Sequence, residues 1–236
     1  MELKEQTEFY NKYWKDYKNF GSYKLQRLSE IVKILEQVRK IKRNPKILDL
    51  GCGDGRFCAV WNEVGETVGM DLSTKAMDMA SKRYPFIDFH AGDATKTEFK
   101  DGAFDIIISQ EVIEHIEIQH EYVKECQRLL SHNGVLILTT PNKYYFDRRK
   151  GGNYSNQPIE NILNPSQLKD LLAKDFRLLD FYTIIHPKGD YGIYKLLGSL
   201  IIRYGFSALK AEFLLQRIMS KSLLGLNIVC IAQKKK

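Results

Sequence analysis

Short apolar runs recur along the chain, with amphipathic segments between them. Two of these runs, 106–108 and 135–138, are continuously apolar rather than alternating, which is typical of strands buried on both faces. Strands that alternate with helix-length segments predict successive βαβ units. The predicted strands are 46–50, 67–71, 87–91, 104–109 and 135–140, then 178–185 and 227–232. The pattern predicts an α/β fold, Rossmann-like and doubly wound, with a seven-stranded, mostly parallel sheet.

Helical additions are predicted before this core. Residues 1–43 are expected to form two helices, with a break at Gly21. Two interpretations of the first helix stay open: its aromatic face packs it onto the domain, or the helix is a lid over a binding site. The aromatic residues, close to helical spacing, are Phe9, Tyr10, Tyr13, Trp14, Tyr17 and Phe20.

The segment after the fifth strand, 143–163, is polar and contains Gly151 and Gly152, which predicts a loop. It leaves the carboxyl end of a central strand, where ligands bind in open α/β sheets. Asn164 and Pro165 then fit the N-cap and the first position of a helix. The helix before the fifth strand is expected to bury Tyr122, Cys126, Leu129 and Leu130, and 133–134 to turn the chain into that strand.

The first predicted strand runs directly into a glycine-rich turn that contains Gly51, Gly53 and Gly55. Glycines let the backbone bend sharply there and let a ligand approach without a Cβ in the way. Asp71 ends the second predicted strand about 20 residues later, the position from which a carboxylate reaches ribose hydroxyls. The arrangement predicts a nucleotide-binding turn.

The spacing of the glycines and the charge around them indicate which nucleotide binds. Dinucleotide-binding turns read G-x-G-x-x-G/A, but here the third small residue is Gly55 and the expected position holds Arg56. Pyrophosphate favours a helix N-terminus without negative charge, whereas Asp49, Asp54 and Asp93 surround this turn. Acidic side chains suit a ligand that carries a sulfonium and an ammonium. The sequence therefore favours S-adenosylmethionine over NAD as the cofactor.

Composition limits the alternatives without changing the fold. The net charge of +7 is modest, and three lysines at the end of the sequence contribute to it as an expected solvated tail. No apolar leader and no run of about 18 apolar residues is present, so a cytoplasmic protein without a transmembrane segment is expected. Buried free thiols, which suit a reducing compartment, are predicted for Cys52, Cys58, Cys126 and Cys230.

In these motifs and their order, the chain resembles a class I S-adenosylmethionine-dependent methyltransferase and is similar to the ubiquinone-biosynthesis O-methyltransferases. The motifs that carry the resemblance are 47–55 (ILDLGCGDG), 68–73 (VGMDLS), 92–94 (GDA), 104–116 (FDIIISQEVIEHI) and 136–142 (LILTTPN). The resemblance is close over 44–145, the expected cofactor-binding core. A single domain is expected over 1–236, with 1–43 as a helical lid and 190–225 as a helical insertion.

The resemblance also implies which residues hold the cofactor. These are Asp49, Gly51, Cys52, Gly53, Asp71, Leu72, Asp93, Ala94 and Gln110. It puts Asp49 and Gly51 near the methionine moiety, Asp71 on the ribose, and the pair 93–94 at the adenine. Gln110 is expected beside the cofactor, and Cys52 is expected to contribute its backbone rather than a nucleophile.

Methyl transfer from a sulfonium is an in-line displacement, so the protein mainly positions the reactants and excludes water. A base is needed only where the acceptor must lose a proton. The predicted catalytic residues are His115 and Glu111, which follow the fourth strand at its carboxyl edge. The wider group of Glu111, Glu114 and His115 has three interpretations: structural or substrate-positioning, general base through His115, or a metal site.

The metal interpretation requires all three side chains on one helical face, where they could hold Mg²⁺, Mn²⁺ or Zn²⁺. Small-RNA 2′-O-methyltransferases carry a similar Glu-x-x-Glu-His and take a further histidine from the region after the fifth strand. This chain has no histidine between His132 and His186. We therefore predict no metal.

The predicted function is O-methylation of a small-molecule, sugar-containing or lipid-linked acceptor. One alternative is RNA 2′-O-methylation, against which the missing histidine and the lack of a basic-aromatic patch both count, so a nucleic-acid partner is not expected. Another is a non-catalytic module that binds S-adenosylmethionine.

The insertion at 190–225 is rich in Leu, Ile and Phe, with Lys and Arg at intervals, and its glycines predict two or three short helices. None of these would be long enough to span a bilayer. Three interpretations stay open. The helices complete the core at the sheet edge, cap a pocket for a bulky acceptor, or make a peripheral contact with a membrane surface.

Overall fold

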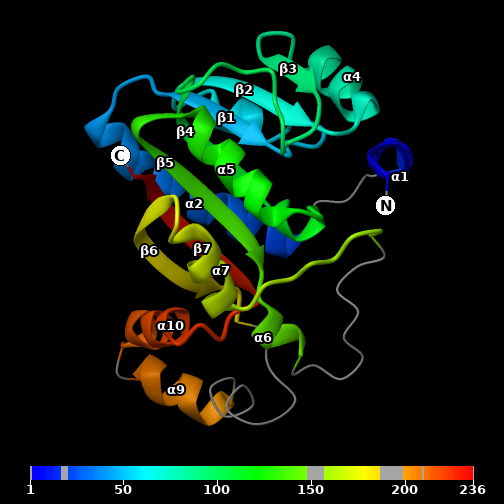
Figure 1. Ribbon diagram of the computed structural model, residues 1–236. Helices are drawn as coiled ribbons and strands as arrows, with labels where there is room; N and C mark the ends of the chain where they lie inside the picture. Colours follow the sequence, from blue (N-terminus) through cyan, green and yellow to red (C-terminus); the bar gives the residue numbers. More distant parts are fainter. Residues whose placement is uncertain (1, 17–20, 148–156, 187–198, 209, 236) are drawn as a thin grey trace.

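The computed structural model describes residues 2–16, 21–147, 157–186, 199–208 and 210–235, and Figure 1 shows a twisted sheet with helices on both faces. The strands are β1 (Lys46–Leu50), β2 (Glu66–Asp71), β3 (Asp88–Ala91), β4 (Phe104–Gln110), β5 (Leu130–Pro141), β6 (Phe176–Ile184) and β7 (Asn227–Lys234). The helices are α1 (Leu3–Asp16), α2 (Ser22–Ile41), α3 (Cys58–Trp61), α4 (Thr74–Arg83), η1 (Ile113–His115), α5 (Gln119–Leu129), α6 (Lys143–Phe146), α7 (Pro165–Leu172), α9 (Leu200–Ala208) and α10 (Glu212–Lys221).

The strand order of the sheet is β3-β2-β1-β4-β5-β7-β6. The first five strands pair in parallel, while β7 lies antiparallel between β5 and β6. The predicted doubly wound, mostly parallel sheet is therefore confirmed. The strand order reverses between β1 and β4, and ligands bind in open α/β sheets at the carboxyl edge of such a switch point.

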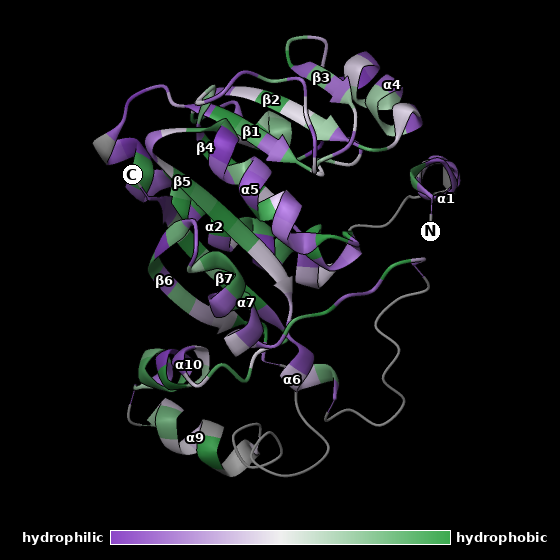
Figure 2. Ribbon diagram, in the orientation of Figure 1, coloured by the Kyte–Doolittle hydropathy of each residue, from purple (hydrophilic) through white to green (hydrophobic). Residues whose placement is uncertain are grey.

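Alternate residues of each central strand serve the two faces of the sheet. Ile47 packs with Ile31 and Leu35 of α2 on one face, whereas Leu48 packs with Tyr122 of α5 on the other. Figure 2 shows the apolar positions concentrated in these central strands. The predicted burial of Cys126 and Leu129 on α5 is confirmed, and Leu130 is also buried, although it begins β5. Burial on both faces explains the continuous apolar runs and holds the carboxyl edge rigid.

Two segments differ from the sequence pattern. β5 begins at Leu130 rather than at 135, because the pairing with β4 jumps from Phe104↔Leu130 to Ile106↔Val135. Asn133, with φ +63°, makes its predicted turn inside this irregularity. The predicted loop after β5 begins with the short helix α6, whose N-cap Asn142 accepts a hydrogen bond from the Tyr144 amide. Residues 148–156 of that loop lie outside the described part.

The C-terminal additions sit at the carboxyl edge beside β6. Ser220 of α10 and Thr183 of β6 exchange two hydrogen bonds, and the Asn142 amide donates to the carbonyls of Leu223 and Gly225. α9 and α10 are the described part of the predicted insertion, while 190–198 and the aromatic positions 17 and 20 lie outside the described residues. No helix in the described part of the chain is long and apolar enough to cross a membrane.

Candidate active site

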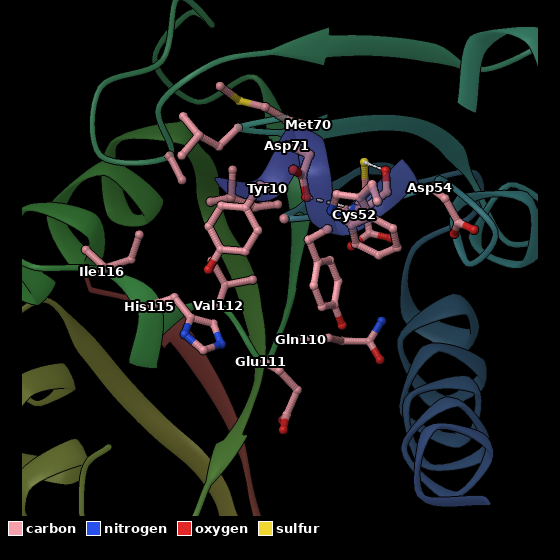
Figure 3. Close-up of a pocket in the computed structure, with 18 of the residues that line it drawn as sticks. Tyr10, Cys52, Asp54, Met70, Asp71, Gln110, Glu111, Val112, His115 and Ile116 are labelled. Carbon is pink, nitrogen blue, oxygen red and sulfur yellow. Dashed lines mark hydrogen bonds between the residues drawn. The ribbon is translucent and has the colours of Figure 1, made fainter. Parts of the chain in front are cut away.

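A pocket of about 300 Å³ opens at the carboxyl edge of β1, β2 and β4. Every residue that the sequence assigned to the cofactor or to catalysis lines it, although these residues come from four separate segments of the chain. Figure 3 shows Asp71 and Met70 at one side of this pocket and Gln110, Glu111 and His115 at the other. The pocket also contains side chains of α1 and α2 that the motifs did not indicate.

The glycine turn forms the floor of the pocket. Gly51 and Gly53 have φ of +85° and +57°, a region that L side chains rarely adopt. The amides of Gly51 and Cys52 both donate to the Met70 carbonyl, at 2.7 and 2.9 Å, which ties the turn to the end of β2. A Cβ on Gly53 would lie 2.3 Å from the Trp14 ring, so α1 packs directly on this backbone. The glycine turn and α1 therefore line this part of the cavity together.

Two backbone amides hold the Asp71 carboxylate in place. Its Oδ2 accepts from Gly53 N and its Oδ1 from Ser73 N, both at 2.9 Å. Burial raises the pKa of Asp71, while these amide bonds act in the opposite direction. A carboxylate has about four lone-pair sites, so both oxygens can still accept hydroxyl donors from the pocket.

Asp49 is 2% exposed at the base of the pocket. Its Oδ2 accepts from Trp61 Nε1 at 2.8 Å and lies 3.4 Å from Cys58 Sγ. Burial raises the pKa of Asp49 to about 6. At neutral pH this site therefore holds a poorly solvated negative charge, which favours a cationic ligand.

Asp93 and Ala94 lie at the far end of the pocket, after β3. Asp93 Oδ1 accepts from the amide and the hydroxyl of Thr95, both at 2.8 Å, which fixes the carboxylate. Leu72 and Met70 add apolar surface to the lining of the pocket. The combination of an apolar wall and one fixed acceptor suits a planar base with an amino group.

Two groups at the β4 side have hydrogen-bonding capacity that the described residues do not use. Gln110 Oε1 is buried without a partner. Arg27 of α2 is 12% exposed, and its Nη1 lies 3.7 Å from Glu111 Oε2, longer than a hydrogen bond. An unpartnered acceptor costs free energy when it is buried. The pocket therefore suits a ligand that has both a positively charged N–H donor and an anionic group.

His115 is fixed in one tautomer. Its Nδ1 lies 2.8 Å from the Ile159 carbonyl, which can only accept, so Nδ1 carries the proton and Nε2 has the lone pair. Burial lowers the pKa of His115, which keeps the ring neutral at neutral pH. Its backbone carbonyl accepts from Gln6 Nε2 of α1 at 2.9 Å. The ring lies beneath Tyr10 in Figure 3, with the centroids 6.5 Å apart.

Glu111 and Glu114 do not share a helical face with His115, because η1 covers only 113–115 and Glu111 has φ +56°. The Glu111 carboxylate accepts from Thr139 and Asn227 and turns away from Asp71 in Figure 3. Glu114 is fully buried, and burial and the nearby Glu111 raise its pKa well above the usual range. Among the described residues, no group of three or more His, Cys, Asp or Glu side chains could hold a metal ion.

The roof of the pocket comes from α1 and from the segment before α7. Gln6, Tyr10, Tyr13 and Trp14 all line the cavity. The Tyr10 hydroxyl donates to Gln157 Oε1 at 2.7 Å, and that contact closes the roof over His115. The helical spacing of the aromatic residues in the sequence indicated that α1 has an aromatic face. It offered no signal for Arg27, Gln6 or Gln157, which meet the site only through long-range contacts.

A parallel sheet with this strand order, an antiparallel β7 and a glycine turn backed by an acidic strand end is the architecture of class I methyltransferases. Comparison with known sequences agrees, since residues 48–138 match a family described as a methyltransferase domain. Residues 48–138 therefore belong to the methyltransferase domain family. The family and the fold imply S-adenosylmethionine as the cofactor.

Individual relatives agree with this assignment. A probable S-adenosylmethionine-dependent methyltransferase of Mycolicibacterium smegmatis is 29% identical over 169 residues, 70% of this chain. The chain spans only 62% of that relative's length. A ubiquinone biosynthesis O-methyltransferase of Pelagibacter ubique is 29% identical over 176 residues, covering 66% of this chain and 72% of the relative. The crystal structure of the PH0226 protein of Pyrococcus horikoshii shares the fold, with a TM-score of 0.63 at 18% identity and coverage of 95% and 99%.

The pocket fits S-adenosylmethionine group by group. The unpartnered Gln110 Oε1 and the buried Asp49 suit its ammonium, and Arg27 suits its carboxylate. Asp71 suits the ribose hydroxyls because its oxygens are oriented by backbone amides. Gly51, Cys52 and Gly53 line the same pocket, so a ligand bound there would lie against the turn.

Proposed function

We propose that this protein is an S-adenosylmethionine-dependent methyltransferase that methylates an oxygen of a small-molecule, sugar-containing or lipid-linked acceptor. The observation that carries the proposal is the position of His115. Its Nδ1 is bonded to the Ile159 carbonyl, which leaves a basic Nε2 that lies 3.7 Å from Glu114 Oε1. His115 lines the same pocket as Gln110 and the glycine turn. A hydroxyl acceptor needs such a base, because its proton must leave as the carbon–oxygen bond forms.

Bound S-adenosylmethionine supplies a methyl group that its sulfonium already activates. The residues proposed to hold it are Asp49, Gly51, Cys52, Gly53, Asp71, Leu72, Asp93, Ala94 and Gln110, together with Arg27. His115 accepts the proton of the acceptor at Nε2. Glu111 contributes by position rather than as the base, because Thr139 and Asn227 already hold its carboxylate.

The helices of 1–43 act in this proposal as a lid on the 44–145 core. Gln6 and Tyr10 reach from α1 to the backbone of His115 and to Gln157, and Trp14 packs on Gly53. These contacts exclude water from the site, where water would compete for the base. The name of the Pelagibacter relative supports oxygen as the methylated atom.

Transfer of a labelled methyl group tests the proposal. The protein is incubated with methyl-labelled S-adenosylmethionine and a cell extract, which is then separated into small-molecule, lipid and RNA fractions. We expect label in the small-molecule or lipid fraction, in a bond that product analysis assigns to oxygen. Asp71→Asn should lower this signal when S-adenosylmethionine is limiting, while Asp78→Asn on the outer face of α4 should not. Label confined to RNA, or to nitrogen or carbon, would contradict the assignment.

A further inference from the structure

The outward side of α9 and α10 carries large apolar side chains that the described residues leave exposed. Phe213 and Tyr204 are 76% and 71% exposed, the highest values among the described large apolar residues. Leu214 and Ile218 are about half exposed on the same unit. Figure 2 shows apolar positions on both helices at the lower end of the molecule. Monomeric proteins rarely leave such side chains clustered without a partner.

This face is not simply an unpacked side of the core. α10 already has an inner face, where Leu215 is buried and Ser220 exchanges hydrogen bonds with Thr183 of β6. At 100° per residue, Phe213 and Arg217 point away from Leu215, while Leu214 and Ile218 both lie on one side of the helix, between that outward face and Leu215. The exposed side chains therefore project outward from a helix that is anchored to the sheet.

The charge of the α9–α10 segment indicates what kind of partner would cover its apolar side chains. Residues 199–222 contain the bases Arg203, Lys210, Arg217 and Lys221 but only one acid, Glu212. Lys221 pairs with Asp180 of β6, so its charge is already used within the protein. Lys210 and Arg217 are exposed, and neither side chain has a recorded partner within the described residues. Apolar side chains interleaved with bases are typical of helices that lie in the interface of a bilayer. A second copy of the same basic face would repel it.

We propose that the outward face of α9 and α10 docks on a bilayer surface that carries anionic lipids. Phe213, Leu214 and Ile218 would enter the interface, Tyr204 would lie at the headgroup level, and Arg217 and Lys210 would meet the lipid phosphates. The face lies at the carboxyl edge, next to the segment that leaves β5. The inference goes beyond the proposed function and does not rest on it, since docking needs no methyl transfer.

Vesicle sedimentation with the full chain tests the proposal. One set of vesicles contains phosphatidylcholine alone, and the other equal parts of phosphatidylcholine and phosphatidylglycerol. We expect pelleting with the anionic set, weaker pelleting with the neutral set, and loss as salt rises. Phe213→Ser should weaken vesicle binding about tenfold, because it removes an aromatic ring that docking would bury in the bilayer interface. Arg217→Gln should weaken vesicle binding about fivefold, since each basic side chain near an anionic surface adds a factor of about this size to the affinity.

Matched controls lie at the opposite end of the sheet. Phe86→Ser changes an aromatic side chain that is 66% exposed before β3, and Lys82→Gln changes an exposed base of α4. Both should bind vesicles like the wild type. Sedimentation velocity of the same variants reports any self-association. The proposal is overturned if the wild type pellets with neither set, if the controls weaken binding equally, or if Phe213→Ser only converts a dimer into a monomer.

Discussion

Gln110 of β4 has a buried oxygen that no other described residue satisfies, and Arg27 of α2 lines the same pocket with a 3.7 Å contact to Glu111. If Arg27 binds the cofactor's carboxylate, Arg27→Gln removes a charge-assisted bond worth about 1.5–3 kcal/mol, or roughly 10- to 100-fold in affinity. Calorimetry with S-adenosylhomocysteine measures this change. Arg39→Gln, on an exposed site of the same helix, should bind normally. Equal affinity of both variants would place the carboxylate elsewhere.

His115 makes the proposed reaction depend on pH. Burial lowers its pKa below the usual 6.5, so the neutral, basic form dominates at neutral pH. Turnover should rise with pH through this lowered pKa and then level off. His115→Asn should lower turnover about 10²- to 10⁴-fold and leave cofactor affinity unchanged. The exposed His120→Asn is the control, and a pH profile that His115→Asn does not alter would remove His115 as the base.

Metal removal separates this role from the metal interpretation of the same residues. With a proton-accepting His115, EDTA should leave turnover unchanged, and added Mn²⁺ or Zn²⁺ should not increase it. Metal analysis of the purified protein provides a readout that does not depend on turnover. Stoichiometric metal that is lost in Glu114→Ala would contradict the prediction of no metal.

Asp49 should affect stability as well as binding. Its folded pKa of about 6 lies above its ordinary value, so its contribution to stability is full at low pH and is lost as pH rises through 6. The free energy of unfolding of Asp49→Asn minus that of the wild type should therefore rise between pH 4 and pH 7, by up to about 3 kcal/mol. Urea unfolding of the unliganded proteins at the two pH values measures the difference. A difference that does not change with pH would show that Asp49 has an ordinary pKa.

The site residues that the sequence identified share a physical origin. Asp71, Asp93 and Gln110 follow strands, and parallel strands bring their carboxyl ends to one edge, so local pattern plus fold class is enough to group them. Arg27 and Gln6 belong to helices whose docking depends on long-range packing. No periodicity encodes such a contact, and these two residues could not be predicted.

At the scale of elements, α1 is held at two points on either side of the pocket. Gln6 donates to the His115 carbonyl, and Asn11 Oδ1 accepts from Ser73 Oγ and Lys75 N at the start of α4. Asn11→Ala should therefore speed hydrogen exchange of the α1 amides, and S-adenosylhomocysteine should slow exchange there if α1 is a lid. The exposed Lys12→Ala is the control. Exchange in α1 that neither the ligand nor Asn11→Ala changes would contradict the lid.

The elements themselves were largely predictable. All seven strands were expected within a few residues, and Asn164 with Pro165 marked the start of α7, where the structure has a full capping box with Gln167. The early start of β5 was not expected, since Leu130 pairs with Phe104 across an irregularity that no pattern of apolar residues reveals. α6 was missed because its four residues are too few to show a helical period.

At the scale of the whole molecule, strand order and the antiparallel direction of β7 place the pocket and the α9–α10 face on the same edge of the sheet. Periodicity predicts strands but not their order, so this arrangement came from the family resemblance and then from the structure. If the proposed docking holds, an acceptor embedded in the bilayer surface would reach the protein from the side on which the pocket opens.

The central claim is that this pocket binds S-adenosylmethionine through Asp71. Titration calorimetry of S-adenosylhomocysteine into wild type, Asp71→Asn and Asp78→Asn tests it most directly, with NAD titrated in parallel. The account predicts one site per chain in the wild type, affinity weakened roughly 10- to 100-fold in Asp71→Asn, normal affinity in Asp78→Asn, and no tight binding of NAD. Tight NAD binding by the wild type, or unchanged affinity in a folded Asp71→Asn, would contradict it.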